Sequence, residues 1–217
     1  MTGMIKTYLV PARRILAALA VLCAAAAASR AQDFDYYLLA LSWTPSYCAA
    51  EGATRDREQC DPARGLGFAV HGLWPQYDEG GWPEFCHAAV RDPSRRETGA
   101  MADIMGSGGL AWYQWRKHGR CTGLEARDYF AATRSAFAAL VMPRIRDQRL
   151  TEAEVEAAFL AANPGLDSNG VIVTCRDGLV REVRICLTPE LEPRDCGDDV
   201  LRATCRARGD LHLPPAR

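Results

Sequence analysis

Residues 113 to 121, YQWRKHGRC, place three chemically versatile side chains at helical spacing. Gln114, Lys117 and His118 stand at positions i, i+3 and i+4, so a helix through this stretch presents them on one face. Of the 26 basic residues in the chain, all but Lys6 and Lys117 are arginine. A position that needs a compact ammonium rather than a planar guanidinium accounts for this exception. Chance in an arginine-rich composition accounts for it equally well.

A second histidine, His71, ends the alternating stretch LGFAVH, in which Gly67 and Ala69 leave its face uncrowded. Two imidazoles with an ammonium between them suit phosphodiester cleavage by an internal nucleophile. One histidine removes the 2′-hydroxyl proton, the other protonates the leaving 5′-oxygen, and the cation stabilises negative charge on the phosphorane. The competing interpretation is structural, because a helix C-terminus stabilises a protonated histidine without any catalysis.

These side chains need strands and helices to position them, and the sequence predicts both. Aromatic and aliphatic residues over 34–43 indicate a buried strand, and the alternation over 66–71 indicates another. An Asp177-Gly178 turn joins VIVTC to REVRICL as a hairpin. Together with the helices, these strands predict an α+β fold, in which several helices pack on a central antiparallel β-sheet.

Three helices are predicted. The first covers 109–118, with Trp112 and Trp115 pointing inward and Gly119 as a left-handed cap. The second covers 125–141, by the spacing of its large apolar residues. The third begins with a capping box at Thr151 and Glu154 and ends before Pro164.

The first 31 residues have the layout of a secretory signal peptide. Basic residues precede an apolar run over 15–28, and the small residues Ser29 and Ala31 stand at positions −3 and −1 of a cleavage site before Gln32. Cleavage leaves residues 32–217 as one domain, in which no segment is apolar enough to cross a bilayer. The expected location is the periplasm or the extracellular space, with no membrane attachment after cleavage.

The leader changes how charge and cysteine content are interpreted. It contains four of the 26 basic residues and no acidic residue, which leaves 22 against 27 and a net charge of −5. Because proteins that hold nucleic acid mainly by neutralising phosphates are basic, any polyanionic substrate must be recognised locally. Eight cysteines remain after Cys23 is removed, an even number that indicates four disulfides in an oxidising compartment but selects none of 105 pairings.

Two segments carry a family resemblance. HGLWPQ over 71–76 and WRKHGRC over 115–121 resemble the two active-site segments of the ribonuclease T2 family, whose usual forms are HGLWP and HEWxKHGTC. FDYYLLALSWTPSYC near the start, WPEFC over 82–86 and EVRICL over 182–187 extend the resemblance in the family's order, across nearly the whole domain.

The resemblance implies a metal-independent endoribonuclease that needs no cofactor and cleaves single-stranded RNA with low base specificity. His118 would be the general base, His71 the general acid, and Lys117 the group that stabilises the phosphorane. The products would be a 2′,3′-cyclic phosphate and then a 3′-phosphate, formed with the two histidine roles reversed. We expect a monomer.

The resemblance also assigns the substrate contacts. Trp74 and Trp82 match the aromatic positions that hold the base on the 5′ side of the cut, and stacking contributes about 1–3 kcal/mol per base. Both tryptophans could instead belong to the core, but proline and glycine neighbours favour exposure in a loop. Gln76 falls where some members carry an acid that biases base choice. His87 and His212 match no catalytic position and are expected at the surface.

Two positions depart from the family pattern. Tyr113 replaces a histidine that assists phosphate binding, and its hydroxyl can still donate a hydrogen bond. Gln114 replaces a glutamate whose charge would raise neighbouring histidine and lysine pKa values. We expect an active enzyme, slower than relatives that carry the glutamate, with the basic limb of its pH profile shifted to lower pH.

Family pairing implies four disulfides, and the second would fix the two imidazoles relative to each other: Cys48–Cys60, Cys86–Cys121, Cys175–Cys205 and Cys186–Cys196. Two alternatives to the active enzyme stay open. One is a catalytically impaired family member that acts as an RNA-binding or signalling protein. The other is a metal-dependent nuclease, although the sequence shows no carboxylate cluster of the kind that hard cations need.

Overall fold

The computed structural model describes residues 34–51, 54–145, 149–207 and 209–216. The leader predicted over 1–31 lies outside these residues, so the cleavage site stays a prediction. Among the helices of the described ranges, none combines the length and apolarity that a bilayer crossing requires.

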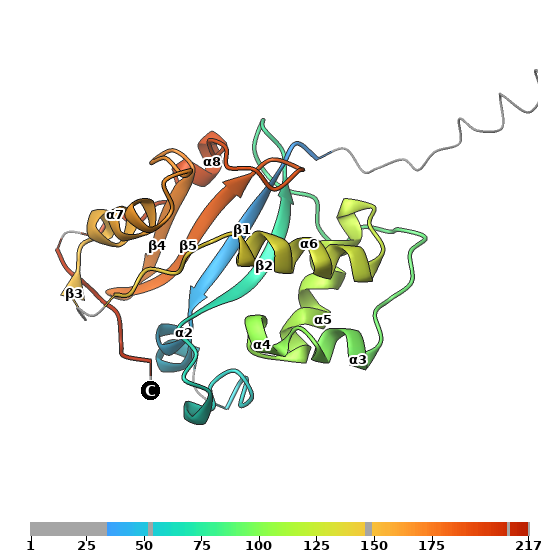
Figure 1. Cartoon of the computed structure of the whole chain (residues 1–217), viewed down its shortest axis with the longest axis horizontal. Coiled ribbons are helices and arrows are strands. Elements are labelled where there is room, and N and C mark those ends of the chain that lie inside the picture. The colour runs from blue at the N-terminus through green and yellow to red at the C-terminus, as the bar shows by residue number, and fades with distance from the viewer. Residues whose placement is uncertain (1–33, 52–53, 146–148, 208, 217) are drawn as a thin grey trace, which may run out of the picture. The chain divides into compact units, whose positions relative to one another are not determined.

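The centre of the fold is an antiparallel sheet of four strands in the order β2-β1-β5-β4 (Figure 1). Two short strands, β6 and β3, continue from the Leu179 end of β5, with β6 parallel to it. The predicted α+β class is confirmed. The strand bounds are β1 (Tyr36–Trp43), β2 (Phe68–Gln76), β3 (Arg149–Leu150), β4 (Val171–Arg176), β5 (Leu179–Leu187) and β6 (Leu211–His212).

The predicted hairpin is β4–β5, and its turn has the conformation that the sequence demands. Asp177 and Gly178 have φ angles of 52° and 76°. Two successive positive φ angles define the tight turn that matches the twist of paired strands, and aspartate followed by glycine tolerates them best. The expected strand over 66–71 is longer than predicted, because β2 continues through Trp74 to Gln76.

A β-bulge interrupts the pairing of β1 with β2. Ala40 is opposite Gly72 and Leu41 is opposite Val70, so His71 is the extra residue on β2. The bulge reverses the alternation, and as a result Val70 and Leu73 both lie in the main core. His71 and Trp74 would face opposite sides of an unbroken strand, yet both line one cavity.

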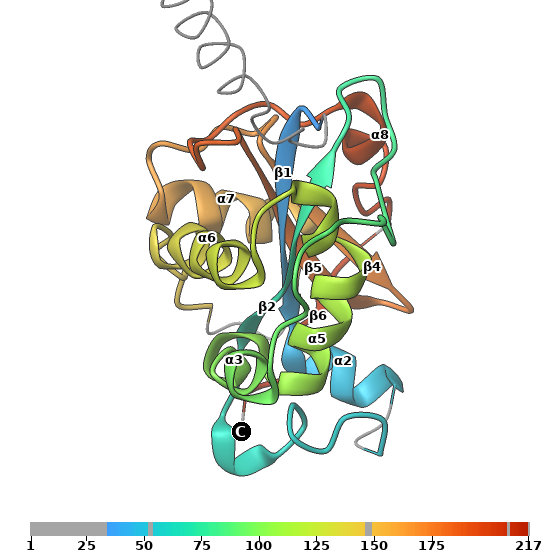
Figure 2. The ribbon, with the colours of Figure 1, turned by 90° about the vertical axis from the view of Figure 1, so that its right-hand side faces the viewer.

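Helices cover both faces of the sheet. In Figure 2, α6 and α7 lie on one side of the strands, and α2 and α8 lie on the other. The helices are α2 (Thr44–Glu51), η1 (Pro62–Arg64), α3 (Arg95–Gly99), α4 (Ala102–Met105), α5 (Gly108–Lys117), η2 (Gly119–Thr122), α6 (Ala126–Ala138), α7 (Glu152–Ala162) and α8 (Asp198–Leu201). The main core lies between the sheet and the α6–α7 side, and a smaller apolar cluster lies under α8.

The helix predictions hold with three corrections. The predicted capping box is confirmed, because Thr151 and Glu154 cap the start of α7 reciprocally. The helix expected over 125–141 spans only Ala126–Ala138. Gly119 is no left-handed cap: it begins η2, and a Cβ atom there would lie 2.5 Å from the Trp115 ring, so close packing requires the glycine. The left-handed glycine is Gly123, with φ of 73°.

The third correction concerns the two tryptophans of α5. Trp115 is fully buried, as expected, but Trp112 is 36% exposed. The Trp115 ring packs against Tyr129 and Phe130 of α6. Trp112 lies about 60° further round the helix, at the edge of its buried side.

Four disulfides join the eight cysteines of the described domain in the pairing that the resemblance implies: Cys48–Cys60, Cys86–Cys121, Cys175–Cys205 and Cys186–Cys196. Cys86–Cys121 joins the loop after β2 to η2, directly behind the helix end that carries His118. A backbone hydrogen bond of 2.8 Å from Phe85 N to Lys117 O makes a second link between the same two segments.

Candidate active site

A cavity of about 920 Å³ opens on the face of the sheet opposite the main core. It lies between β2, β5, α2 and α5. The site residues predicted from the sequence all line it: His71, Trp74, Gln76, Trp82, Tyr113, Gln114, Lys117 and His118. The fold therefore gathers these side chains, which come from distant parts of the chain, into one cavity.

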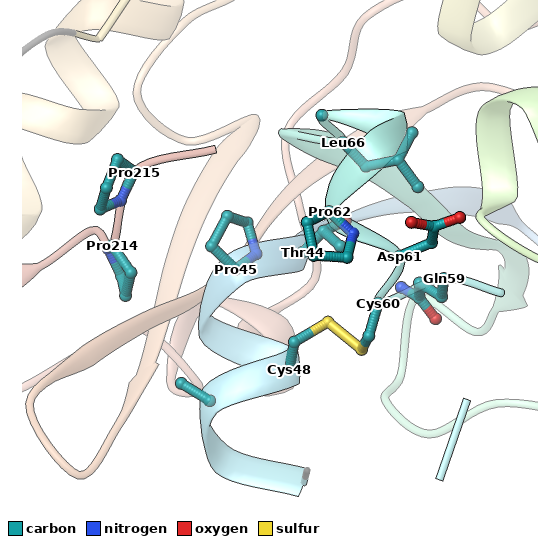
Figure 3. Close-up of a pocket in the computed structure, with 12 residues that line it drawn as sticks. Thr44, Pro45, Cys48, Gln59, Cys60, Asp61, Pro62, Leu66, Pro214 and Pro215 are labelled. Atoms are coloured by element: carbon teal, nitrogen blue, oxygen red, sulfur yellow. A yellow bond between two sulfur atoms is a disulfide. The ribbon is translucent and has the colours of Figure 1, made fainter. Parts of the chain in front are cut away.

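A second, smaller cavity of about 310 Å³ lies beside α2 and η1. Figure 3 shows its proline-rich lining and the Cys48–Cys60 disulfide at its edge. It contains none of the predicted catalytic or substrate-binding residues and no histidine, lysine or arginine. We therefore place the candidate chemistry in the larger cavity.

His71 is held by a buried carboxylate on the central strand. Its Nδ1 lies 2.6 Å from Glu182 Oε1, and the other Glu182 oxygen accepts hydrogen bonds from Arg184. Burial raises the pKa of Glu182, but the hydrogen bonds and charges of His71 and Arg184 outweigh it and lower the pKa to about 2. Because the ionised carboxylate can only accept, His71 Nδ1 must carry the hydrogen, which leaves Nε2 for other partners.

His118 occupies the opposite kind of environment. It is the C-cap of α5, its exposed fraction is 3%, and its Nδ1 is buried without a hydrogen-bond partner among the described residues. Burial, with the nearby charges of Lys117 and His71, lowers the pKa of His118 to about 3. The imidazole is therefore neutral at ordinary pH.

Trp74 lies between the two histidines. Its ring is 5.1 Å from the His71 ring, edge to face, and 5.2 Å from the His118 ring, stacked at 29°. Its indole N–H donates to Gln114 Oε1 at 2.7 Å. A Cβ atom on Gly72 would lie 2.6 Å from the same oxygen, so only glycine at this position lets the indole and the amide meet. The expectation that Trp74 lies in a loop is wrong, because it belongs to β2 and is half-buried.

Lys117 is engaged by an acidic residue from the loop after β2. Its ammonium is 3.3 Å from Glu84 Oε2, which also accepts a hydrogen bond of 3.2 Å from the Trp82 indole. Hydrogen bonds from Trp82 and Lys117 lower the pKa of Glu84. Trp82 is 49% exposed, as the sequence predicted for a loop tryptophan.

The remaining predicted residues differ in accessibility. Tyr113 is 49% exposed at the cavity rim, whereas Gln76 is buried and donates to the carbonyl of Pro75 at 2.9 Å. His87 and His212 are exposed, and neither lines the cavity.

The sequence interpretation missed three charged residues: Glu182, Arg184 and Glu84. The first two stand in EVRICL, a segment that carries the family resemblance but to which the sequence assigns no role. They face the cavity because they alternate with Val183 and Ile185, which lie in the main core. A second bulge, with Arg181 as an extra residue on β5, comes just before them. The sequence alone does not reveal that β5 pairs with β1 and so carries this face to His71. Among the described residues, no cluster of three or more histidine, cysteine, aspartate or glutamate side chains is placed to hold a metal ion.

Comparisons with known proteins identify the family. Residues 34–196 match the model of the ribonuclease T2 family. A ribonuclease of Aeromonas hydrophila is 44% identical over 103 residues, which cover 48% of this chain and 45% of the relative. A probable ribonuclease of Haemophilus influenzae is 30% identical over 173 residues, covering 75% and 61%. The chain thus spans about half the length of the curated relatives it matches.

Solved structures share the fold. An RNase-related protein from Calystegia sepium superimposes with a TM-score of 0.64 at 20% identity, over 85% of this chain and 99% of that protein. RNase NT, solved in complex with 5′-AMP, superimposes with a TM-score of 0.58 at 24% identity, over 85% and 100%. The family match covers both active-site segments, the bulged strands and the residues around the cavity, so this chain belongs to the ribonuclease T2 family.

Proposed function

We propose that the protein is an endoribonuclease that cleaves single-stranded RNA by attack of the 2′-hydroxyl on the adjacent phosphate. The observation that carries the proposal is the contrast between two histidines in one cavity. One is hydrogen-bonded to an ionised carboxylate and the other is buried and neutral. Proteins assign acid and base roles to two titratable groups by giving them environments of opposite kinds.

The neutral His118 has the protonation state of a general base. The negative phosphate that enters beside it favours protonation of the ring, so its basicity increases when substrate is bound. His71 has the opposite role. The Glu182 carboxylate stabilises a positive charge on its ring, and the Nε2 proton of that imidazolium is the one donated to the leaving 5′-oxygen. Hydrolysis of the 2′,3′-cyclic phosphate then uses the same two groups with their roles reversed.

Lys117 supplies the positive charge for the phosphorane oxygens. Its partner Glu84 is an exposed carboxylate, and an incoming phosphate has to displace it. Exposed ion pairs of this kind contribute little to stability because water and salt screen them, so phosphate binding readily offsets the displacement.

Substrate entry also requires a movement of Trp74. The indole covers His118, and the base cannot reach the 2′-hydroxyl until the two rings separate. Gln114 holds the indole by one hydrogen bond, which limits its position without locking it. With Trp82 exposed nearby, the two tryptophans supply stacking surfaces that tolerate any base, which supports low base specificity. Gln76 also lines the cavity, but it is buried and its amide nitrogen already donates to Pro75 O, which leaves it poorly placed to bias that choice.

One assay tests the reaction class. The protein, with its disulfides intact, is incubated with single-stranded RNA and DNA in excess EDTA, alongside a His71→Ala variant. We expect RNA to be cut to cyclic-phosphate ends, DNA to stay intact, and the variant to be inactive. Cleavage only after a divalent metal is added would support a metal-dependent nuclease instead.

The departures at Tyr113 and Gln114 favour one alternative function, a catalytically impaired member that binds RNA or acts in signalling. In that case the native protein would bind RNA and leave it uncut under all these conditions. We further propose that the protein works as a monomer in the periplasm or outside the cell after removal of residues 1–31.

A further inference from the structure

The exposed side of α5 combines aromatic and cationic residues. Trp112 and Arg116 are an i, i+4 pair, as are Tyr113 and Lys117, so the four side chains adjoin on neighbouring rows of the helix. Tyr113 is 49% exposed and Arg116 is exposed. Aromatic rings beside cations are the features that non-specific single-stranded nucleic acid sites combine.

Phe85 adds a third aromatic residue to this surface, and its backbone is strained. Its φ angle is 51°, in the left-handed region that costs free energy for any residue with a bulky side chain. The hydrogen bond to Lys117 O and the disulfide at the next residue, Cys86, hold the chain in this conformation. The ring gains little burial in return, because it is 49% exposed. Strain of this kind concentrates at functional sites.

The Phe85 ring lies next to the Tyr113 ring, with centroids 6.4 Å apart and planes at 75°. The two rings define a platform at the rim of the cavity. Tyr113 and Trp82 line the cavity itself, and Lys117 is one helical turn from Tyr113. The platform is therefore continuous with the candidate active site and lies outside the space between the two histidines.

We propose that the Phe85–Tyr113 platform binds a nucleobase of single-stranded RNA outside the dinucleotide that is cleaved, with Arg116 near that nucleotide's phosphate. This inference rests on the proposed function and extends it from a dinucleotide site to a longer binding track. It also explains how an acidic protein binds a polyanion: each added nucleotide contributes a stacking contact that needs no net positive charge. The stacking is sequence-tolerant because every base has an aromatic face.

The test measures binding separately from cleavage. Uncleavable 2′-O-methyl RNA oligonucleotides of two and eight residues are titrated at one fixed salt concentration, and affinity is measured by fluorescence anisotropy. The key variant is Phe85→Gly, because glycine removes the ring and also accepts the left-handed backbone without strain. Its melting temperature is expected to equal or exceed that of the native protein, so reduced binding cannot be attributed to unfolding.

We expect Phe85→Gly to weaken octanucleotide binding about 5- to 10-fold, the lower range for losing one stacking ring. The loss on the dinucleotide should be several-fold smaller. Phe85→Trp should restore octanucleotide affinity to near the native value. Val141→Ala, which shortens an exposed apolar residue outside the cavity lining, serves as the matched control and should bind both ligands like the native protein.

Two outcomes would overturn the platform: Phe85→Gly binding the octanucleotide as tightly as the native protein, or equal losses on both lengths. A native protein that binds the octanucleotide through Phe85 but cuts no RNA would refute the proposed cleavage and leave the platform standing. If the protein cuts RNA but prefers neither length, the platform alone fails. A surface made for a protein partner would give this last result.

Discussion

At the scale of single residues, the site depends on giving two identical side chains opposite surroundings. His71 has an ionised carboxylate 2.6 Å from Nδ1, whereas the His118 Nδ1 is buried with no partner in the described part of the chain. Both histidines were predictable from the sequence as candidates. Their surroundings were not, because Glu182 is 111 positions from His71 and reaches it only through the pairing of three strands.

The first residue-scale prediction concerns Glu182→Gln. The amide keeps a hydrogen-bond acceptor for His71 but cannot stabilise a positive ring. We therefore expect kcat to fall about 10- to 1000-fold. This is a smaller loss than the roughly 10⁴-fold drop in kcat that follows when the carboxylate behind the histidine of a serine protease is replaced by an amide. The basic limb of the pH–kcat profile should move to lower pH, while KM changes little.

Glu156→Gln, an acid-to-amide change on α7 outside the cavity lining, is the control and should leave the profile unaltered. The Glu182→Gln variant could instead keep the native pH profile and lose kcat only in proportion to a smaller folded fraction. That result would show that Glu182 has a structural role alone.

The second residue-scale prediction concerns Gln114→Glu. The added carboxylate can still accept the Trp74 indole N–H and brings negative charge towards His118 and Lys117. It should raise the His118 pKa from about 3. Since the base must be unprotonated, activity is lost as pH falls through that pKa. The pH–kcat/KM profile of the native protein should therefore lie at lower pH than that of the variant, on both limbs. Superimposable profiles would contradict this.

At the scale of elements, the site depends on irregularities in otherwise regular strands. The strict alternation expected over 66–71 correctly separates Phe68 and Val70 from His71. Continued along the strand, it would place Trp74 on the core face, whereas Trp74 lines the cavity. Sequence patterns report the period of a strand, whereas a bulge changes its phase and depends on the partner strand. Glu182 and Arg184 escaped prediction for another reason: they alternate regularly with the core residue Val183, but the pairing of β5 with β1 that brings them beside His71 is not visible in the sequence.

The element-scale prediction concerns the link between the loop after β2 and η2. Replacing Cys86 and Cys121 by serine should destabilise the fold by about 2–5 kcal/mol, as removal of a native disulfide usually does. At a temperature where the variant is still folded, we also expect kcat to fall about 10- to 100-fold, because the segment that ends α5 at His118 loses its anchor.

The comparison is the double serine variant of Cys186 and Cys196, a pair that lies outside the cavity lining. It should lose stability in urea unfolding but keep its kcat. Equal effects of the two double variants on kcat would argue against a positioning role for Cys86–Cys121.

At the scale of the whole molecule, much of the architecture was accessible from the sequence. The α+β class, the hairpin at Asp177-Gly178 and the capping box of α7 follow from local patterns, and the structure confirms them. The disulfide pairing came from family resemblance alone, since cysteine spacing permits many pairings. The prediction that Trp112 points inward was wrong, because the helical spacing does not reveal which side of α5 has a neighbouring helix to pack against.

The whole-molecule prediction is a loss of stability in acid that comes from the site itself. In the unfolded chain His118 binds a proton below the ordinary histidine pKa of 6.5, whereas the folded protein resists protonation until about pH 3. The unfolded state therefore binds more protons between these values, and stability falls as pH decreases. Glu182, with its pKa lowered from 4.5 to about 2, adds a loss in the same direction below pH 4.5.

Urea unfolding at pH 7 and pH 4 measures this effect. We expect His118→Gln to lose about 3 kcal/mol less stability than the native protein over that interval, since one titrating group changes the free energy of unfolding by about 1.4 kcal/mol per pH unit. A variant that loses as much stability as the native protein would show that His118 is not the buried neutral group described above.

The extra residue on β2 gives the site an unusual dependence on chain length. Deleting Gly72 would let β1 and β2 pair without interruption and would keep Val70 and Leu73 together on the apolar face of the sheet. The protein would still fold around the same interior. His71 would then take the place of Gly72 opposite Ala40, where a Cβ atom lies 2.6 Å from Gln114 Oε1. The imidazole would collide with the indole and the amide that it now lies beside, so a polypeptide one residue shorter would keep its shape and lose its chemistry.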